Sequence, residues 1–141
     1  MRYRVVAVGR VRDAALRAAC DEYLERLRHY TRVEEREVRD EARVLEAVPE
    51  GSRLIALSRS GEECTSAQLA DWTARWDMDG RDVALAIGGA DALPEYVLRQ
   101  AERIWSLSRL TLPHELARVV LYEQLYRAYT IRRGEPYHRG G

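Results

Sequence analysis

The sequence predicts a single α/β domain, residues 1–141, built on a mainly parallel sheet flanked by helices. Its 141 residues match one ordinary domain, enough to bury a core and too few for two full domains. Apolar residues make up 46% and charged residues 33%, the balance of a globular protein rather than of a disordered one. Segments with strand patterns also alternate with segments with helix patterns, and this order favours a parallel sheet.

The first third of the chain contains a strand, a long helix and a charged segment. Residues 3–9, YRVVAVG, are rich in β-branched side chains and close on glycine, which is typical of a buried strand. Apolar residues recur every three or four positions over residues 13–30, so they share one face of a helix. The charged segment contains a weak strand pattern at 33–38 and a short helix pattern at 42–48, before a turn at 49–52.

The middle third continues the alternation of strands and helices. Residues 53–58, RLIALS, are predicted to form a strand that ends in the polar loop RSGEECTS. Thr65 or Ser66 caps the next helix, and Gly80 marks its end. The apolar stripe of this helix consists of Leu69, Trp72 and Trp76. Residues 82–87, DVALAI, are apolar on both faces, as expected for a central parallel strand.

The last third ends in a segment of unusual composition. Pro94 suits the first turn of a helix that reaches about residue 103, and SLSRLTLP at 106–113 is predicted to be a short extended piece and a loop. A final helix is expected at 115–131. The closing segment PYHR, at 136–139, combines side chains that stack on a ring, exchange a proton and hold an anion. This tail is therefore either idle or part of a functional site.

Three segments are expected to meet at the carboxyl ends of the strands, where parallel sheets bind ligands. Leu57 and Ser58 end one strand, Gly88 and Gly89 follow another, and the loop 106–113 lies nearby. Adjacent glycines allow a ligand to approach the backbone with no Cβ in the way, although tight turns use the same pair. No GxGxxG or GxxxxGK[ST] pattern is present, which disfavours a dinucleotide or a triphosphate. We therefore expect a pocket for another small ligand.

Other site classes find little support in the sequence. Cys20 and Cys64 lie far apart without a CxxC pattern or a nearby histidine, so neither a disulfide framework nor a metal site is expected. His29 lies among charged residues and fits a solvated surface, whereas His114 at a helix start fits a structural role as well as a functional one. No apolar run approaches the roughly 20 residues that span a bilayer, so we expect a cytoplasmic protein with no membrane partner.

Several of these segments together resemble one known family. VVAVGRVR, DEYLERLRHY, LIALSRSG, DVALAIGGADAL, WSLSRLTLPHELARVVLYEQLYRAYTI and PYHR are similar, in the same order, to the ribosomal RNA large subunit methyltransferase H family of the SPOUT superfamily. The resemblance covers nearly the whole chain. Its most specific part is the run from Trp105 to Arg139.

The resemblance implies a fold, an activity and a site. It implies a carboxyl-terminal trefoil knot, a homodimer, and methylation of N3 of a pseudouridine in 23S ribosomal RNA by S-adenosylmethionine. Because the short chain has no basic surplus, we also expect the assembled ribosome rather than naked RNA to be the substrate, and we expect no metal. By position, the residues of the donor pocket would be Leu57, Ser58, Gly88, Gly89, Ser108, Arg109, Leu110, Thr111, Leu112 and Pro113. The tail residues Tyr137, His138 and Arg139 would form the substrate side.

The chemistry of this reaction suggests a role for each tail residue. An imide N3 attacks well only after losing its proton, so a base or a group that stabilises the developing anion is needed. In this hypothesis His138 takes the proton directly or through water, Arg139 binds a phosphate or a carbonyl oxygen, and Tyr137 stacks on or orients the nucleoside. The alternatives are a non-catalytic ribosome-binding protein of the same fold and a SPOUT methyltransferase that acts on another RNA.

Three features depart from the family pattern. The segment 38–52 is shorter than usual, Ser58 stands where aspartate is common, and Ala92 stands where glycine is common. Gly88 and Gly89 are retained, so the predicted donor loop keeps its glycine pair.

Overall fold

The computed structural model describes residues 1–140 and contains one five-stranded sheet in the order β2-β1-β4-β3-β5. Every pair of neighbouring strands is parallel. The strands are β1 (Arg2–Val8), β2 (Arg32–Val38), β3 (Arg53–Glu62), β4 (Val83–Ile87) and β5 (Arg103–Trp105). This confirms the predicted α/β class with a parallel sheet. The trefoil knot stays a prediction.

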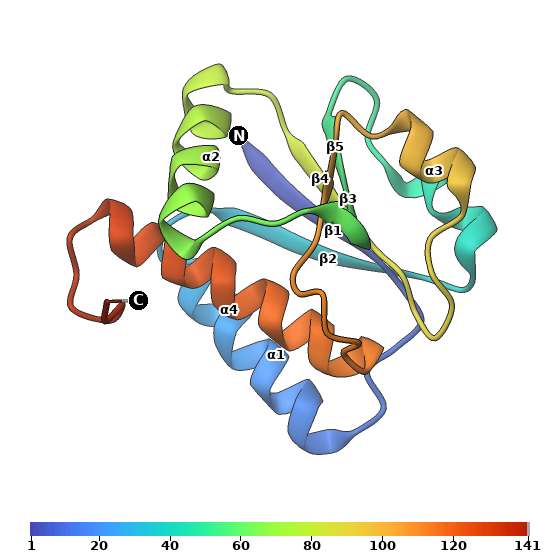
Figure 1. Ribbon diagram of the computed structural model, residues 1–141, viewed down its shortest axis with the longest axis horizontal. Coiled ribbons are helices and arrows are strands. Elements are labelled where there is room, and N and C mark those ends of the chain that lie inside the picture. The colour runs from blue at the N-terminus through green and yellow to red at the C-terminus, as the bar shows by residue number, and fades with distance from the viewer. Residues whose placement is uncertain (141) are drawn as a thin grey trace.

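The helices cover both faces of the sheet (Figure 1). One face carries α1 (Ala14–Leu27), α2 (Ser66–Asp79) and α4 (His114–Arg132), with α4 in contact with both other helices. The opposite face carries α3 (Glu95–Gln100) and two short 3-10 turns, η1 (Glu41–Arg43) and η2 (Leu45–Ala47). The segment predicted as a short helix at 42–48 is therefore a pair of 3-10 turns.

Alternating side chains of the strands build two separate cores. In β1, Tyr3, Val5 and Ala7 pack toward α1, α2 and α4, whereas Val6 and Val8 pack toward α3 and the 3-10 turns. All five residues of β4 are buried, as predicted for a central strand. Trp72 and Trp76, predicted on an apolar stripe, are buried, as is Trp105, and all three belong to the α1, α2 and α4 side.

The edge beyond β4 differs most from the sequence prediction. The third strand was predicted to end at residue 58, but β3 continues to Glu62, where it pairs with Trp105 after an irregularity in register. The helix predicted to reach residue 103 ends at Gln100, and β5 forms in its place. A Cβ on Gly61 would lie 2.6 Å from the backbone of Ile104, so a glycine is needed where these two segments meet.

The start of α2 resolves a choice that the sequence left open. Thr65, rather than Ser66, is the N-cap, and its side chain accepts a hydrogen bond from the N–H of Gln68 at 3.0 Å. Gln68 reaches back to the N–H of Thr65 at 2.8 Å, which completes a capping box.

Among residues 1–140, no helix is long and apolar enough to cross a membrane, and no group of three or more histidine, cysteine or acidic residues is arranged to hold a metal ion.

Candidate functional site

A cavity of about 810 Å³ opens at the carboxyl ends of β3 and β4. Three stretches line most of it, namely residues 57–60, residues 87–93 and residues 107–112, with His114 and Ala117 from the start of α4. Every residue predicted for the donor pocket belongs to this lining except Pro113, which is the N-cap of α4. The structure therefore brings the three predicted segments together, and their binding role stays a prediction.

The glycine pair lies where β4 leaves the centre of the sheet. A Cβ on Gly88 would lie 2.7 Å from the carbonyl oxygen of Asp91, and a Cβ on Gly89 would lie 2.9 Å from the carbonyl oxygen of Val8. Both distances are shorter than a real side chain tolerates, so the tight packing of this turn requires glycine twice. The floor of the cavity is thus formed largely by backbone.

The serines of the loop after β5 help to hold its shape. The N–H of Ser106 donates to the carbonyl oxygen of Glu62 at 2.8 Å, and its hydroxyl donates to the carbonyl oxygen of Ser108 at 3.1 Å. The Ser108 hydroxyl in turn accepts from the N–H of Leu110 at 3.0 Å. Leu110 remains 73% exposed at the cavity, which leaves an apolar side chain free to cover a ligand.

Several lining residues were not predicted from the sequence. Arg59 and Ser60 reach the cavity because β3 continues past residue 58, and the Arg59 guanidinium donates to the hydroxyl of Thr111 across it. Ser58, where the family commonly has aspartate, shares a hydrogen bond of 2.9 Å with the Ser60 hydroxyl. Asp91 supplies a carboxylate to the same lining. The strand pattern of residues 53–58 gave no signal for this extension.

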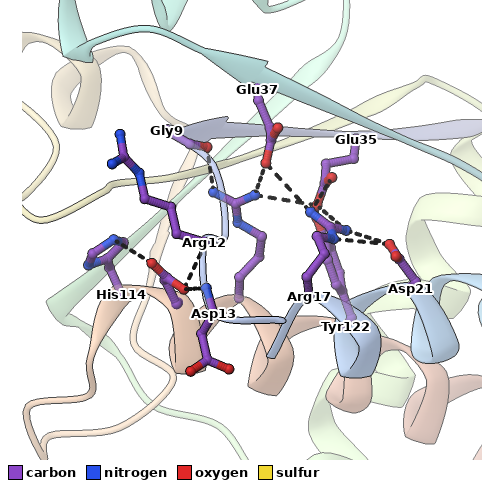
Figure 2. A network of polar contacts seen from close by, with 11 residues as sticks. Gly9, Arg12, Asp13, Arg17, Asp21, Glu35, Glu37, His114 and Tyr122 are labelled. Atoms are coloured by element: carbon purple, nitrogen blue, oxygen red, sulfur yellow. Dashed lines mark hydrogen bonds and ion pairs between the residues drawn. The ribbon is translucent and has the colours of Figure 1, made fainter. Parts of the chain in front are cut away.

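A polar network fixes the start of α4 beside the cavity (Figure 2). Glu115 accepts the N–H groups of Arg12 and Asp13, each at 3.0 Å, and the Asp13 N–H is the main cause of a lowered pKa for Glu115. One turn later, Arg118 is 2% exposed and donates to the carbonyl oxygen of Gly9 at 2.8 Å and to the carboxylate of Glu37. These contacts tie α4 to the carboxyl ends of β1 and β2.

The same network continues along the face shared by α1 and α4. Arg17 of α1 donates to Glu35 of β2 at 2.9 Å, and the hydroxyl of Tyr122 of α4 donates to the same carboxylate. Burial raises the pKa of Tyr122, and the negative charge of Glu35 raises it further. The hydroxyl therefore stays protonated and keeps donating, so both helices remain fixed to β2.

The tail contacts the second half of α4. The Tyr137 hydroxyl donates to Glu123 at 2.8 Å, and Arg127 donates to Nδ1 of His138 at 3.0 Å. The ring of Tyr137 also meets the ring of Tyr126 edge-on, with centroids 4.7 Å apart. Two of the three predicted tail residues are thus held in place, and both of their polar partners, Glu123 and Arg127, lie on α4.

The two predicted halves of the site do not meet within one chain. None of Tyr137, His138 and Arg139 lines the cavity, which touches only the start of α4. Ala117 at the cavity and Arg127 at the tail are separated by about 15 Å along the helix axis, at about 1.5 Å per residue. Figure 1 shows the tail beyond the carboxyl-terminal end of α4, whereas the loop 106–113 lies at the start of this helix.

Comparison with known proteins identifies relatives along the whole chain. A family model described as "Predicted SPOUT methyltransferase" matches residues 1–138. The chain is 48% identical to the ribosomal RNA large subunit methyltransferase H of Anaeromyxobacter sp. (strain Fw109-5), over 99% of this chain and 100% of the relative. It is 50% identical to the protein of the same description from Sorangium cellulosum (strain So ce56), over 97% of this chain and 99% of the relative.

Solved structures share the fold at low sequence identity. A probable methylase family protein from Haemophilus influenzae Rd KW20 has a TM-score of 0.64 and 10% identity, covering 98% of this chain and 70% of that chain. A probable methyltransferase from Bordetella pertussis Tohama I has a TM-score of 0.59 and 13% identity, covering 91% of this chain and 94% of that chain. The family model and the two full-length relatives extend this likeness to sequence. The chain therefore belongs to the ribosomal RNA large subunit methyltransferase H family of SPOUT methyltransferases.

Proposed function

We propose that this protein transfers a methyl group from S-adenosylmethionine to N3 of a pseudouridine in 23S ribosomal RNA, on the assembled ribosome in the cytoplasm and without a metal. Membership of a ribosomal RNA methyltransferase family supports the reaction class. The observation that carries the proposal is the cavity at the carboxyl ends of β3 and β4, because its lining coincides with the segments that the family resemblance assigns to the methyl donor.

The cavity fits a donor of this size and polarity. About 810 Å³ lies within the usual range of small-ligand pockets. Backbone groups around Gly88 and Gly89 suit the polar edges of an adenosine, and the apolar side chains of Leu57, Leu110 and Leu112 suit its faces. The carboxylate of Asp91 could pair with the ammonium of the donor. All of these residues already line the cavity in the structure.

The reaction needs alignment more than covalent help from the protein. When bound, S-adenosylmethionine supplies a sulfonium methyl group, so the N3 lone pair forms the new C–N bond while the C–S electrons return to sulfur and the N3 proton leaves. The chain's part is to hold donor and acceptor in line and to stabilise the negative charge that develops on the base. In the proposal Tyr137, His138 and Arg139 supply this acceptor side.

The placement of the two halves supports a homodimer. Within one chain the tail and the cavity lie at opposite ends of α4, so the tail of one copy would complete the cavity of another. A second copy related by two-fold symmetry would form two such composite sites. Partly exposed apolar side chains on α4, among them Leu116 and Val119, are available for such an interface.

The charge balance supports recognition of an assembled particle. The chain carries 23 basic and 23 acidic side chains, so it has no overall surplus with which to hold the phosphates of naked RNA. We therefore expect methylation of ribosomes to be much faster than methylation of protein-free 23S RNA. An equal rate on both would contradict this part of the proposal.

The direct test is transfer of labelled methyl from S-adenosylmethionine to ribosomes and to separate subunits from cells that lack the endogenous enzyme. The modified nucleoside is then identified by mass spectrometry, and 3-methylpseudouridine in 23S RNA is the expected product. Donor binding without any methylated nucleoside would favour the non-catalytic ribosome-binding alternative. A methyl group in another RNA would favour the second alternative.

The shared site is tested by mixing two inactive variants. Gly89→Val distorts the cavity of its own chain, because its Cβ would lie 2.9 Å from the carbonyl oxygen of Val8 and displace the turn, and His138→Ala removes the tail group that the chain gives to its partner. Refolded together, the two chains should recover roughly a quarter of the wild-type rate, because about half of the dimers are mixed and each has one intact site. A mixture as inactive as its components would place both halves of each site in the same chain.

A further inference from the structure

Glu123 is the centre of the contacts that hold the tail. Its carboxylate accepts hydrogen bonds from Nη2 of Arg127 at 2.6 Å and from Nε at 3.1 Å. It also accepts a hydrogen bond from the hydroxyl of Tyr137 at 2.8 Å. Glu123 and Arg127 are four residues apart on α4, so they face the same side of the helix. Both side chains are largely buried, at 17% and 24% exposed, which keeps water from competing for the contacts. The guanidinium of Arg127 is therefore held in one orientation.

Arg127 uses its remaining terminal nitrogen on His138. Nη1 lies 3.0 Å from Nδ1 of the imidazole. A guanidinium only donates hydrogen bonds, so Nδ1 must be the acceptor and carries no proton. A neutral imidazole has one proton, which must then lie on Nε2. In this arrangement Nε2 of His138 is a hydrogen-bond donor and has no lone pair with which to take a proton.

Tyr137 is also committed to holding the tail. Its ring packs edge-on against Tyr126 and lies under the guanidinium of Arg127, 4.8 Å from the ring centroid. Burial raises the pKa of Tyr137, and the hydrogen bond to Glu123 raises it further. The hydroxyl thus stays protonated and keeps donating to Glu123. Glu123 thus holds both the residue that precedes His138 and the arginine that contacts its ring.

We propose that Glu123 and Arg127 are positioning residues that lock His138 in its Nε2–H tautomer, so that His138 donates a hydrogen bond to the acceptor base instead of removing its proton. This inference rests on the proposed function, because it gives the tail of that same site a defined role. It replaces the general-base role that the residue type alone suggested for His138.

The proton balance of the step changes accordingly. Before N3 attacks, its proton passes to solvent water or hydroxide, and the negative charge that this leaves is shared by N3 and the two carbonyl oxygens that flank it. The Nε2–H group donates to one of these oxygens and keeps its proton throughout the reaction. This is stabilisation of a developing anion by a pre-oriented donor, which is strongest when the donor does not have to reorganise.

The tautomer is measured directly by nitrogen-15 NMR of the full-length protein labelled at histidine. For His138 we expect a protonated Nε2 and an unprotonated Nδ1 in the wild type, with the resonances assigned by their loss in His138→Gln. Arg127→Met should convert this pattern into an average of the two tautomers. A wild-type His138 protonated on Nδ1, or a pattern unchanged in Arg127→Met, would overturn the proposal.

The consequence for catalysis is tested by a double-mutant cycle on ribosomes. Arg127→Met should lower kcat by about tenfold or more while the donor Kd stays within about twofold, because the donor for the developing anion is misaligned. Arg127→Lys, which retains a positively charged donor group, should recover part of the loss. In a His138→Ala background, Arg127→Met should cost less than about twofold further, because the pair acts as a unit. The same fold-loss in both backgrounds would mean that Arg127 acts independently of His138.

A control arginine and two independent measurements distinguish failure of the proposed function from failure of the positioning role. Arg75→Met removes an exposed arginine from α2 and should leave the His138 tautomer and the transfer rate unchanged. The NMR pattern does not depend on methyl transfer. A locked tautomer in a protein that methylates no RNA would therefore contradict the proposed function alone, whereas active transfer with an unlocked tautomer would contradict the positioning role alone.

Discussion

The two candidate halves of the site are constructed in opposite ways. The floor of the cavity is formed by backbone turns at Gly88 and Gly89, and its loop is held by its own serines together with contacts of Arg59 and Arg109 at its rim. The tail is held by side chains that converge on Glu123 and Arg127 of α4. A binding site for the methyl donor can be formed by backbone, because the ligand itself supplies the reactive methyl group. A site that stabilises charge on the acceptor needs oriented side chains.

This difference predicts different consequences of mutation. In the cavity, a substitution acts by adding volume, and it should weaken donor binding. On the tail, a substitution removes a polar group, and it should slow the reaction while donor binding is kept. Helix α4 connects both regions, so a substitution that loosens its attachment to the sheet should affect stability first.

The largest effect is expected on the tail. His138→Ala should lower methyl transfer about 100- to 1,000-fold, the usual cost of losing one donor to a developing anion, with the donor Kd unchanged by calorimetry. His138→Gln keeps an amide N–H near the position of Nε2 and should recover part of this loss. Equal loss of donor binding and of transfer in His138→Ala would break the distinction between the two halves.

The next effect concerns the attachment of α4. Arg118 is 2% exposed and pairs with Glu37, so Arg118→Met leaves the carbonyl oxygen of Gly9 without this donor and Glu37 with only the longer contact to Arg17 at 3.5 Å. The free energy of unfolding should fall by about 3 kcal/mol, as for other broken buried ion pairs, measured by urea denaturation. Arg39→Met, an exposed arginine after β2, is the matched control and should change it by less than about 0.5 kcal/mol. A similar loss in both variants would mean that Arg118 contributes little beyond ordinary surface charge.

A smaller effect is expected at the floor of the cavity. Gly88→Ala places a methyl group 2.7 Å from the carbonyl oxygen of Asp91, so the turn has to open to accommodate it. Donor affinity should fall about tenfold, because a shift of this turn costs on the order of 1 to 2 kcal/mol of strain or lost contact. Ala90→Ser, which adds one hydroxyl to the same lining, is the control. Unchanged affinity in Gly88→Ala would show that this backbone does not contact the donor.

The sequence predicted the cavity better than the tail, for physical reasons. A glycine pair after an apolar strand is a local pattern, and the parallel topology then determines which strand ends share an edge. The extension of β3 and the formation of β5 depend instead on contact between Gly61 and Ile104, which are far apart in sequence. The secondary-structure propensity of a short segment does not reflect a contact between distant residues, so Arg59 was not predicted as a lining residue.

For the tail, the residue types were visible and their geometry was not. Glu123 and Arg127 have the spacing of a helical ion pair, which is equally common on an idle surface. This pair differs from an idle surface pair because the chain turns back after α4 and brings His138 into contact with Arg127, eleven residues earlier in the sequence. Sequence could therefore name His138 as a proton-exchanging group, whereas the choice between donor and base depends on the contact of its ring with Arg127, a group that only donates hydrogen bonds.

The smallest effect is expected at Thr65, outside both halves. Thr65→Ala removes the capping box of α2 and should lower the free energy of unfolding by about 1 kcal/mol, while Thr65→Ser keeps the hydroxyl and should restore it. Donor Kd and transfer rate should both stay at wild-type values, because neither Thr65 nor Gln68 lines the cavity or contacts the tail. However, Thr65 follows β3 closely, and β3 supplies Arg59 and Ser60 to the cavity. A weaker donor Kd in Thr65→Ala would therefore show that the cavity depends on side-chain contacts beyond its own turns, and the contrast between a backbone-built and a side-chain-built half would no longer hold.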